Sequence, residues 1–142
     1  MTAYQFPPGV IQFRVEPETR SHYFHVYIWP TLATMRHYVR AHGRGDALHK
    51  GSAFTIDFTA EREGVPRGLL GQMHFAKRHL IDDFISHESL HATLIFARWR
   101  GIDGSEVFDV ADPKSRSEER LCYALGSLCG QIKATAEKYG YL

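Results

Sequence analysis

One stretch, residues 79–99, constrains the fold of this 142-residue chain more than any other. Apolar residues recur through it at helical spacing, namely Leu80, Ile81, Phe84, Ile85, Leu90, Leu94, Ile95, Phe96 and Trp99. A helix that is hydrophobic on nearly all sides is normally buried among other elements. We therefore expect residues 79–99 to form the central helix of the fold.

The segments on either side of this helix carry strand and helix signals. Strands are expected at residues 23–29, 53–59 and 69–75, where residues are β-branched, aromatic or alternately apolar and polar. Helices are expected at residues 32–42, with Thr31 as N-cap, and at residues 117–138. Residues 107–110 are expected to form a short strand or a lid. This order predicts an α+β fold with a small mixed or mainly antiparallel sheet and a packed C-terminal helix.

The length fits one domain, because a chain of this size buries roughly 68–70% of its surface without disulfides. Residues 1–20, rich in proline and charge, are expected to be an N-terminal arm with one short strand, and residues 21–142 a single domain. Cys122 and Cys129 are expected on one helix about 10 Å apart, too far for a disulfide. We therefore expect both to be reduced and buried, which suits the cytoplasm.

The overall charge gives little attraction to polyanions. The chain has 17 basic and 16 acidic residues, for a net charge of +1. No basic segment followed by an apolar run opens the sequence, and no apolar stretch approaches the roughly 18 residues of a membrane span. We expect neither a nucleic acid nor a membrane as partner.

The expected central helix contains the sequence H-E-S-L-H at residues 87–91. On a helix, His87 and His91 lie one turn apart on the same face, so both imidazoles can bind one zinc ion. Glu88 would lie beside a zinc-bound water and act as general base. This H-E-x-x-H pattern is typical of metalloproteases. The alternative is a pair of core histidines hydrogen-bonded to their neighbours, with Glu88 in a salt bridge.

A catalytic zinc site usually has three protein ligands, so a third is expected downstream. Glu118 and Glu119 are the candidates, at the start of the C-terminal helix. Acidic residues in a first turn also complement the helix dipole, and Ser115 with Glu118 fits a capping box. The residues alone therefore leave the third ligand open between the two glutamates.

Together, H-E-S-L-H and the later run Glu119-Arg120-Leu121-Cys122 resemble the gluzincin pattern. In that group the third zinc ligand is a glutamate followed three residues on by a small residue. The resemblance therefore favours Glu119 over Glu118, because Cys122 stands at the small position. The layout over about residues 20–135 is similar to minimal gluzincins, including peptidases of the ImmA/IrrE type and small phage-encoded metallopeptidase-like proteins. It implies a zincin-like fold, Zn²⁺ as cofactor, and a peptide-pairing edge strand at residues 71–75.

Two further residues are candidates for contacts with substrate or with the transition state. His74 and Tyr123 have side chains able to stabilise an oxyanion, although each is more often an ordinary packed residue.

Three functions remain in competition. The first is a zinc-dependent peptidase that hydrolyses a protein or peptide substrate through a zinc-activated water. The second is a zinc-site domain that no longer cleaves and acts as a protein-binding module in a phage or host interaction. The third is a nucleic-acid-binding or toxin-like protein using the basic residues of 36–44, which the near-zero net charge disfavours.

Overall fold

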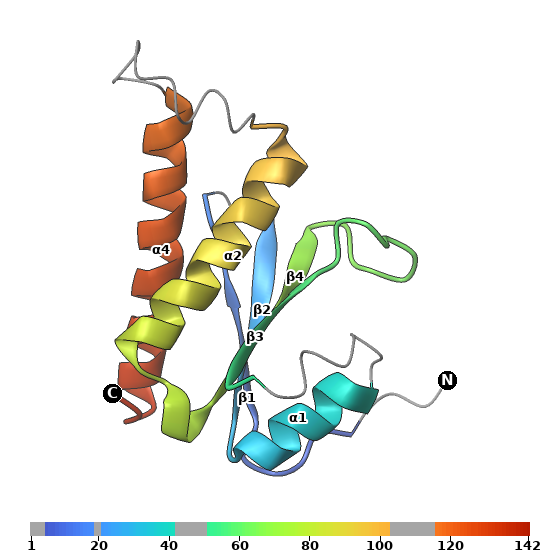
Figure 1. Ribbon diagram of the computed structural model, residues 1–142, viewed down its shortest axis with the longest axis vertical. Helices are drawn as coiled ribbons and strands as arrows, with labels where there is room; N and C mark the ends of the chain where they lie inside the picture. Colours follow the sequence, from blue (N-terminus) through green and yellow to red (C-terminus); the bar gives the residue numbers. More distant parts are fainter. Residues whose placement is uncertain (1–4, 19–20, 42–50, 103–115) are drawn as a thin grey trace.

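Two parallel strands form the middle of the sheet around which the chain folds (Figure 1). They are β2 (Tyr23–Trp29) and β4 (Leu69–Ala76). On one side β1 (Ile11–Val15) pairs antiparallel with β2, and on the other β3 (Ala53–Asp57) pairs antiparallel with β4. The order β1-β2-β4-β3 makes β1 and β3 the two edges of a small mixed sheet. The α+β class and the mixed sheet are as the sequence predicts.

The structure is a computed structural model that describes residues 5–18, 21–41, 51–102 and 116–142. The strand or lid predicted at residues 107–110 lies outside these ranges. Within them, no helix is long and apolar enough to cross a membrane.

Strand β2 is buried on both faces, which explains its nearly continuous run of apolar and aromatic residues. Phe24, Val26 and Ile28 belong to the larger core cluster, on the side of α2 and α4. Tyr27 and Trp29 alternate with them and belong to a second cluster on the side of α1. Because successive side chains of a strand point to opposite faces, β2 contributes residues to both core clusters.

Three helices cover the sheet in the described residues. Helix α1 (Leu32–Ala41) lies on one face, whereas α2 (Asp82–Arg100) and α4 (Arg116–Lys138) lie side by side on the other (Figure 1). A 3₁₀ turn, Lys77–His79, joins β4 to α2, so the predicted central helix begins three residues later than expected. The core between the helix pair and the sheet includes Met73, Phe75, Ile85, Phe96 and Leu128.

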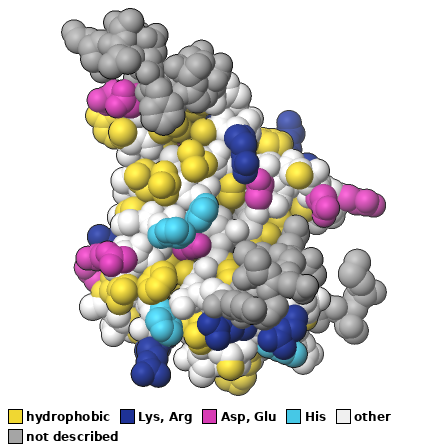
Figure 2. Space-filling model, viewed as in Figure 1, with side chains coloured by type: hydrophobic (Ala, Val, Ile, Leu, Met, Phe, Trp, Pro, Cys, Tyr) yellow, Lys and Arg dark blue, Asp and Glu magenta, His cyan; other side chains and the backbone are white. Residues whose placement is uncertain are grey.

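The expectation that the central helix is buried among other elements holds for one face of α2 only. Helix α2 buries one face against the sheet and α4, but Leu90 and Leu94 on the opposite face are 48% and 49% exposed. Figure 2 shows apolar side chains on this face. Helix α2 therefore has apolar side chains that are not buried by contacts with the other described residues.

The ends of the helices follow the sequence signals. The hydroxyl Oγ1 of Thr31 accepts a hydrogen bond from the amide of Thr34 at 3.1 Å, which confirms Thr31 as the cap of α1. Helix α2 ends at Gly101, which has a φ of 71°. The amide of Ile102 donates to the carbonyl of Ala97, a hydrogen bond that requires the residue between the helix and Ile102 to be left-handed. Glycine adopts this conformation without steric cost.

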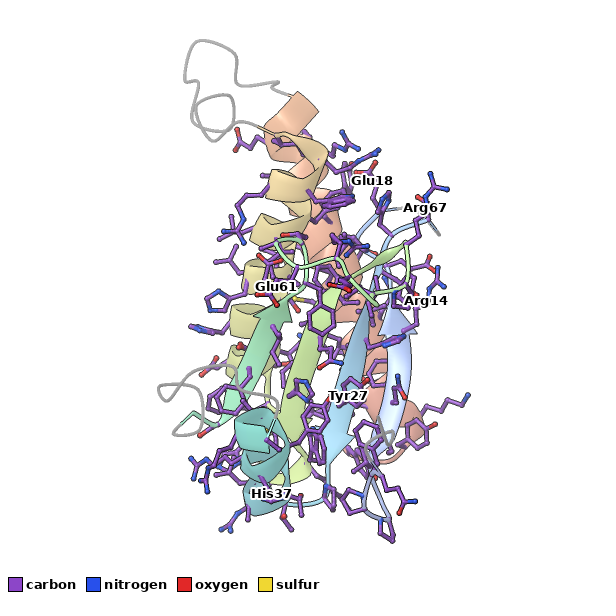
Figure 3. All side chains as sticks on the ribbon, turned by 90° about the vertical axis from the view of Figure 1, so that its right-hand side faces the viewer. Arg14, Glu18, Tyr27, His37, Glu61 and Arg67 are labelled. Atoms are coloured by element: carbon purple, nitrogen blue, oxygen red, sulfur yellow. The ribbon has the colours of Figure 1, made fainter. Side chains whose placement is uncertain are left out.

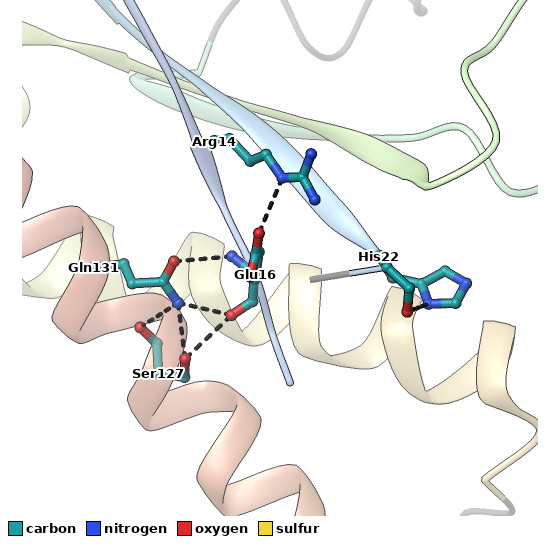
Figure 4. Close-up of polar contacts among 6 residues, drawn as sticks. Arg14, Glu16, His22, Ser127 and Gln131 are labelled. Carbon is teal, nitrogen blue, oxygen red and sulfur yellow. Dashed lines mark hydrogen bonds and ion pairs between the residues drawn. The ribbon is translucent and has the colours of Figure 1, made fainter. Parts of the chain in front are cut away.

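The N-terminal segment contains the predicted short strand, and α4 holds its end. The side chain of Gln131 accepts a hydrogen bond from the amide of Glu16 at 3.0 Å and donates to the carbonyl of Glu16 at 2.7 Å (Figure 4). Ser127 donates to the same carbonyl. Both cysteines are free, as predicted, but neither is fully buried as expected, since Cys122 is exposed and Cys129 is half-buried.

Candidate metal centre

His87 and His91 lie one turn apart on the exposed side of α2, as the motif requires. Their Nε2 atoms are 3.2 Å apart, and their ring planes are inclined by 73°. Two nitrogen ligands at about 2.05 Å from one tetrahedral zinc ion would be about 3.3 Å apart. The two imidazoles therefore already have the spacing that one metal ion needs.

The Glu88 side chain lies next to the histidine pair but points inward, between α2 and β3, and Glu88 is only 3% exposed. One ligand atom from each of His87, Glu88 and His91 lies within 4.8 Å of the other two. Figure 2 shows histidine and acidic side chains together on this face. Among the described residues, Oε2 of Glu88 has no hydrogen-bond partner. Such an orphaned buried oxygen is unusual and fits a site that receives a ligand.

Burial also sets the protonation of the group. It raises the pKa of Glu88 to about 7, a shift that the nearby Thr55 side chain partly offsets. Burial, followed by the charge of His87, lowers the pKa of His91. This shift favours the neutral imidazole of His91, the form that binds a metal, while Glu88 can accept and release a proton near neutral pH.

Two adjoining cavities follow the seam between α2 and β3. One, of about 340 Å³, is lined by Ser52, Ala53, Asp83, Phe84, His87 and Glu88. The other, of about 290 Å³, is lined by Gly51, Ala53, Phe54, Thr55, His87, Glu88 and His91. Because Ala53, His87 and Glu88 line both, the two cavities form one cleft that passes the candidate metal ligands.

The strand beside this cleft is not the one that the sequence suggested. Residues 71–75 were expected to be a peptide-pairing edge strand, but β4 lies between β2 and β3. The edge strand next to the histidine pair is β3. The order of strands depends on long-range pairing, which the local pattern of residues 71–75 does not reveal.

Two polar contacts hold β3 against α2. The Thr55 hydroxyl donates to the backbone carbonyl of Glu88 at 3.3 Å. About two turns beyond His91, Arg98 forms an ion pair with Asp57 at 2.7 Å. Thr55 was not among the residues predicted for the site. The alternation of β3 does place Thr55 and Asp57 on one face of the strand, opposite to the buried Phe54.

The structure does not bring Glu119 together with the histidines. Helices α2 and α4 run antiparallel, since Lys133 pairs with Asp82 at 3.0 Å and the Arg120 guanidinium lies 5.8 Å from the Phe96 ring centre. This register puts Glu119 roughly 8–14 Å further along the helix axis than His87 and His91.

Glu119 lines a separate and larger cavity, of about 540 Å³, together with Pro17, Glu18, Arg120, Tyr123, Ala124 and Ser127. Tyr123, the predicted substrate contact, is 75% exposed there. Glu118 is exposed, and Ser115 of the expected capping box lies outside the described residues. Size alone favours this cavity, but among the described residues that line it the one guanidinium, of Arg120, is paired with Glu18, and none has an imidazole.

His74 also lies away from the pair. It belongs to β4 on the face that α1 covers, the side from which Figure 3 views the sheet. Its ring stacks on Tyr27 at 4.8 Å, Nδ1 accepts a hydrogen bond from Trp29, and Nε2 faces Oε1 of Gln72 at 3.0 Å. Since the indole N–H only donates, the proton of neutral His74 is on Nε2. Both ring nitrogens are thus engaged within the core.

No protein-family model matches the sequence, and searches of curated proteins and of solved structures found no significant match.

Proposed function

We propose that this protein is a zinc-dependent, metallopeptidase-like hydrolase with a zincin-like fold. His87 and His91 would hold the metal, and Glu88 would be the general base. The observation that carries the proposal is the 3.2 Å separation of the two Nε2 atoms beside a buried carboxylate with an unpartnered oxygen. The two imidazole nitrogens fit zinc, which binds histidine nitrogen at about 2.0–2.1 Å.

Each side chain has a distinct chemical task in a peptide hydrolysis. A bound zinc ion would supply Lewis acidity toward a carbonyl and lower the pKa of water. Glu88 faces the cleft, where it takes a proton from the attacking water and returns it to the leaving amine. Thr55 keeps the strand wall in contact with Glu88, and His91 contributes a neutral nitrogen.

The motif resemblance names Glu119 as the third ligand, although the register of α2 and α4 would have to change to bring its carboxylate to the histidines. The test is the zinc content of the purified protein by elemental analysis, for the wild type and for His91→Ala, Glu119→Gln and Glu118→Gln. We expect about one zinc ion per chain in the wild type and in Glu118→Gln, and loss of zinc in His91→Ala. Zinc retained in Glu119→Gln would remove Glu119 from the site, and zinc absent from the wild type would refute the metal centre.

Hydrolysis is tested on unfolded protein substrates, with Glu88→Gln as the control. This variant keeps the shape of the side chain and the metal ligands but cannot accept the proton. General base catalysis is typically worth about 100- to 10,000-fold, so the loss of rate should be plain. Full activity in Glu88→Gln would refute the role of Glu88.

One observation favours the second candidate, a zinc-site domain that binds a protein without cleaving it. Leu90 and Leu94, half-exposed on the same helix as the histidines, suit contact with another protein. A zinc-loaded wild type that binds unfolded substrates but never hydrolyses them would establish this alternative.

A further inference from the structure

The part of the cleft on the N-terminal side of His87 has an acidic and aromatic wall. In the cavity of about 340 Å³, Asp83 and Phe84 stand next to His87 and Glu88. The described residues that line it include no lysine or arginine. Its electrostatic character is therefore set by two carboxyl groups, of which Glu88 is buried and Asp83 is exposed.

Asp83 differs from its neighbour Asp82 in what it contacts. Both are exposed residues of the first turn of α2, where a negative charge complements the helix dipole. Asp82 forms an ion pair with Lys133 at 3.0 Å and lies outside the cavity lining. Among the described residues Asp83 has no ion-pair partner, so its charge is available to whatever enters the cleft.

Phe84 gives this region an apolar surface beside the charge. It is half-buried, packs against the main core, and meets the His79 ring edge-on at 6.0 Å. An arginine or lysine side chain has an apolar stem and a cationic end, which suits an aromatic ring next to a carboxylate. At the neighbouring cavity, by contrast, Arg36 donates to the carbonyl of Gly51, a lining residue. A cation is therefore better accommodated on the Asp83 side.

We propose that the cleft selects peptides carrying an arginine or lysine side chain, which Asp83 binds through its carboxylate and Phe84 through its ring. This inference rests on the proposed function, because it assigns the substrate class of the same site. It makes Asp83 and Phe84 residues that determine specificity, apart from the metal ligands and the general base.

The test measures binding, so it does not depend on turnover. The full-length Glu88→Gln protein, free of metal and labelled with ¹⁵N, is titrated with acetyl-Ala-Ala-Xaa-Ala-Ala-amide, where Xaa is arginine, lysine, norleucine or glutamate. We expect the arginine and lysine peptides to bind about fivefold more tightly than the others, the upper range for a solvent-exposed ion pair. Amide shifts should concentrate at residues 52–53 and 83–88.

Three variants in the same background assign the effect. Asp83→Asn should abolish the preference and Asp83→Glu should retain it. Asp82→Asn, which removes the same charge from the same helical turn, should leave it unchanged. Equal binding of all peptides, no binding of any, or an equal loss in Asp82→Asn would overturn the inference.

Failure of this inference is distinguishable from failure of the proposed function. Zinc-dependent hydrolysis without any preference for basic side chains would refute the specificity alone. Binding of the arginine peptide through Asp83, together with a purified wild type that takes up no zinc in the elemental analysis, would refute the hydrolase and leave the specificity standing.

Discussion

Glu88→Gln should make the metal-free protein more stable at pH 8, although it removes the proposed general base. The carboxyl group is 3% exposed, and burial raises its pKa from 4.5 to about 7. At 1.36 kcal/mol per pKa unit, this difference corresponds to about 3 kcal/mol, and to about 2 kcal/mol once screening through the open cleft is allowed for. Glutamine has nearly the same shape and carries no charge to desolvate.

The sign of the pH dependence follows from proton binding. Below pH 4.5 the carboxyl group is protonated in both states, so Glu88 costs no stability. As the pH rises toward 7, the unfolded chain releases this proton before the folded chain does, and the free energy of unfolding falls. Above about pH 7 the loss is complete. The advantage of Glu88→Gln should therefore be about 2 kcal/mol at pH 8 and less than about 1 kcal/mol at pH 5.

The assay is urea unfolding in a chelating buffer, followed by tryptophan fluorescence at both pH values. His25 and His91 have lowered pKa values, mainly through burial, so both destabilise the fold as the pH falls and the unfolded chain binds the proton first. This opposite trend is common to wild type and variant and largely cancels in their difference. Glu119→Gln, an exposed substitution of the same kind, should change stability by less than about 0.5 kcal/mol. A difference for Glu88→Gln that is absent, or equal at pH 5 and pH 8, would refute the reasoning.

Three other perturbations test the metal centre and the packing that supports it. Zinc at about 100 times its dissociation constant should stabilise the wild type by about 2.7 kcal/mol in thermal unfolding, and His91→Ala should show no such gain. Leu128→Ala, at a fully buried position, should cost about 2–5 kcal/mol in urea unfolding, and a cost below 1 kcal/mol would contradict the packing under α4. Arg98→Ala should cost less than about 1 kcal/mol, because its ion pair with Asp57 is exposed; a larger loss would show that this contact alone holds β3 on α2.

Local patterns predicted the elements well because each element follows its own period. The dense aromatic and β-branched run located β2 at its observed bounds, and alternation located β3 with two residues too many at its C-terminal end. The surroundings of α2 were harder to predict. The sequence does not show whether Leu90 and Leu94 are buried or exposed. Their exposure depends on which face of α2 packs against α4 and the sheet.

In the candidate site, too, contacts within one element could be predicted from the sequence, whereas contacts between elements could not. The contact between His87 and His91 depends only on helical geometry, so four residues of spacing sufficed to predict it. The position of Glu119 depends on the register between α2 and α4, which no local pattern reports. The contact of Thr55 with Glu88 likewise requires knowing that β3 is the edge strand against α2.

One contact links the stability of the fold to its proposed chemistry. Glu88 follows His87 by about 100° around the helix, which turns its carboxyl group toward β3 while the imidazole stays exposed. The strand that forms one wall of the cleft is therefore also the strand that desolvates Glu88. A divalent cation between the histidines would favour the ionised carboxylate and reduce this cost. The stabilisation by Glu88→Gln should accordingly shrink when zinc is added, and an unchanged stabilisation would mean that zinc, if it binds, does so away from Glu88.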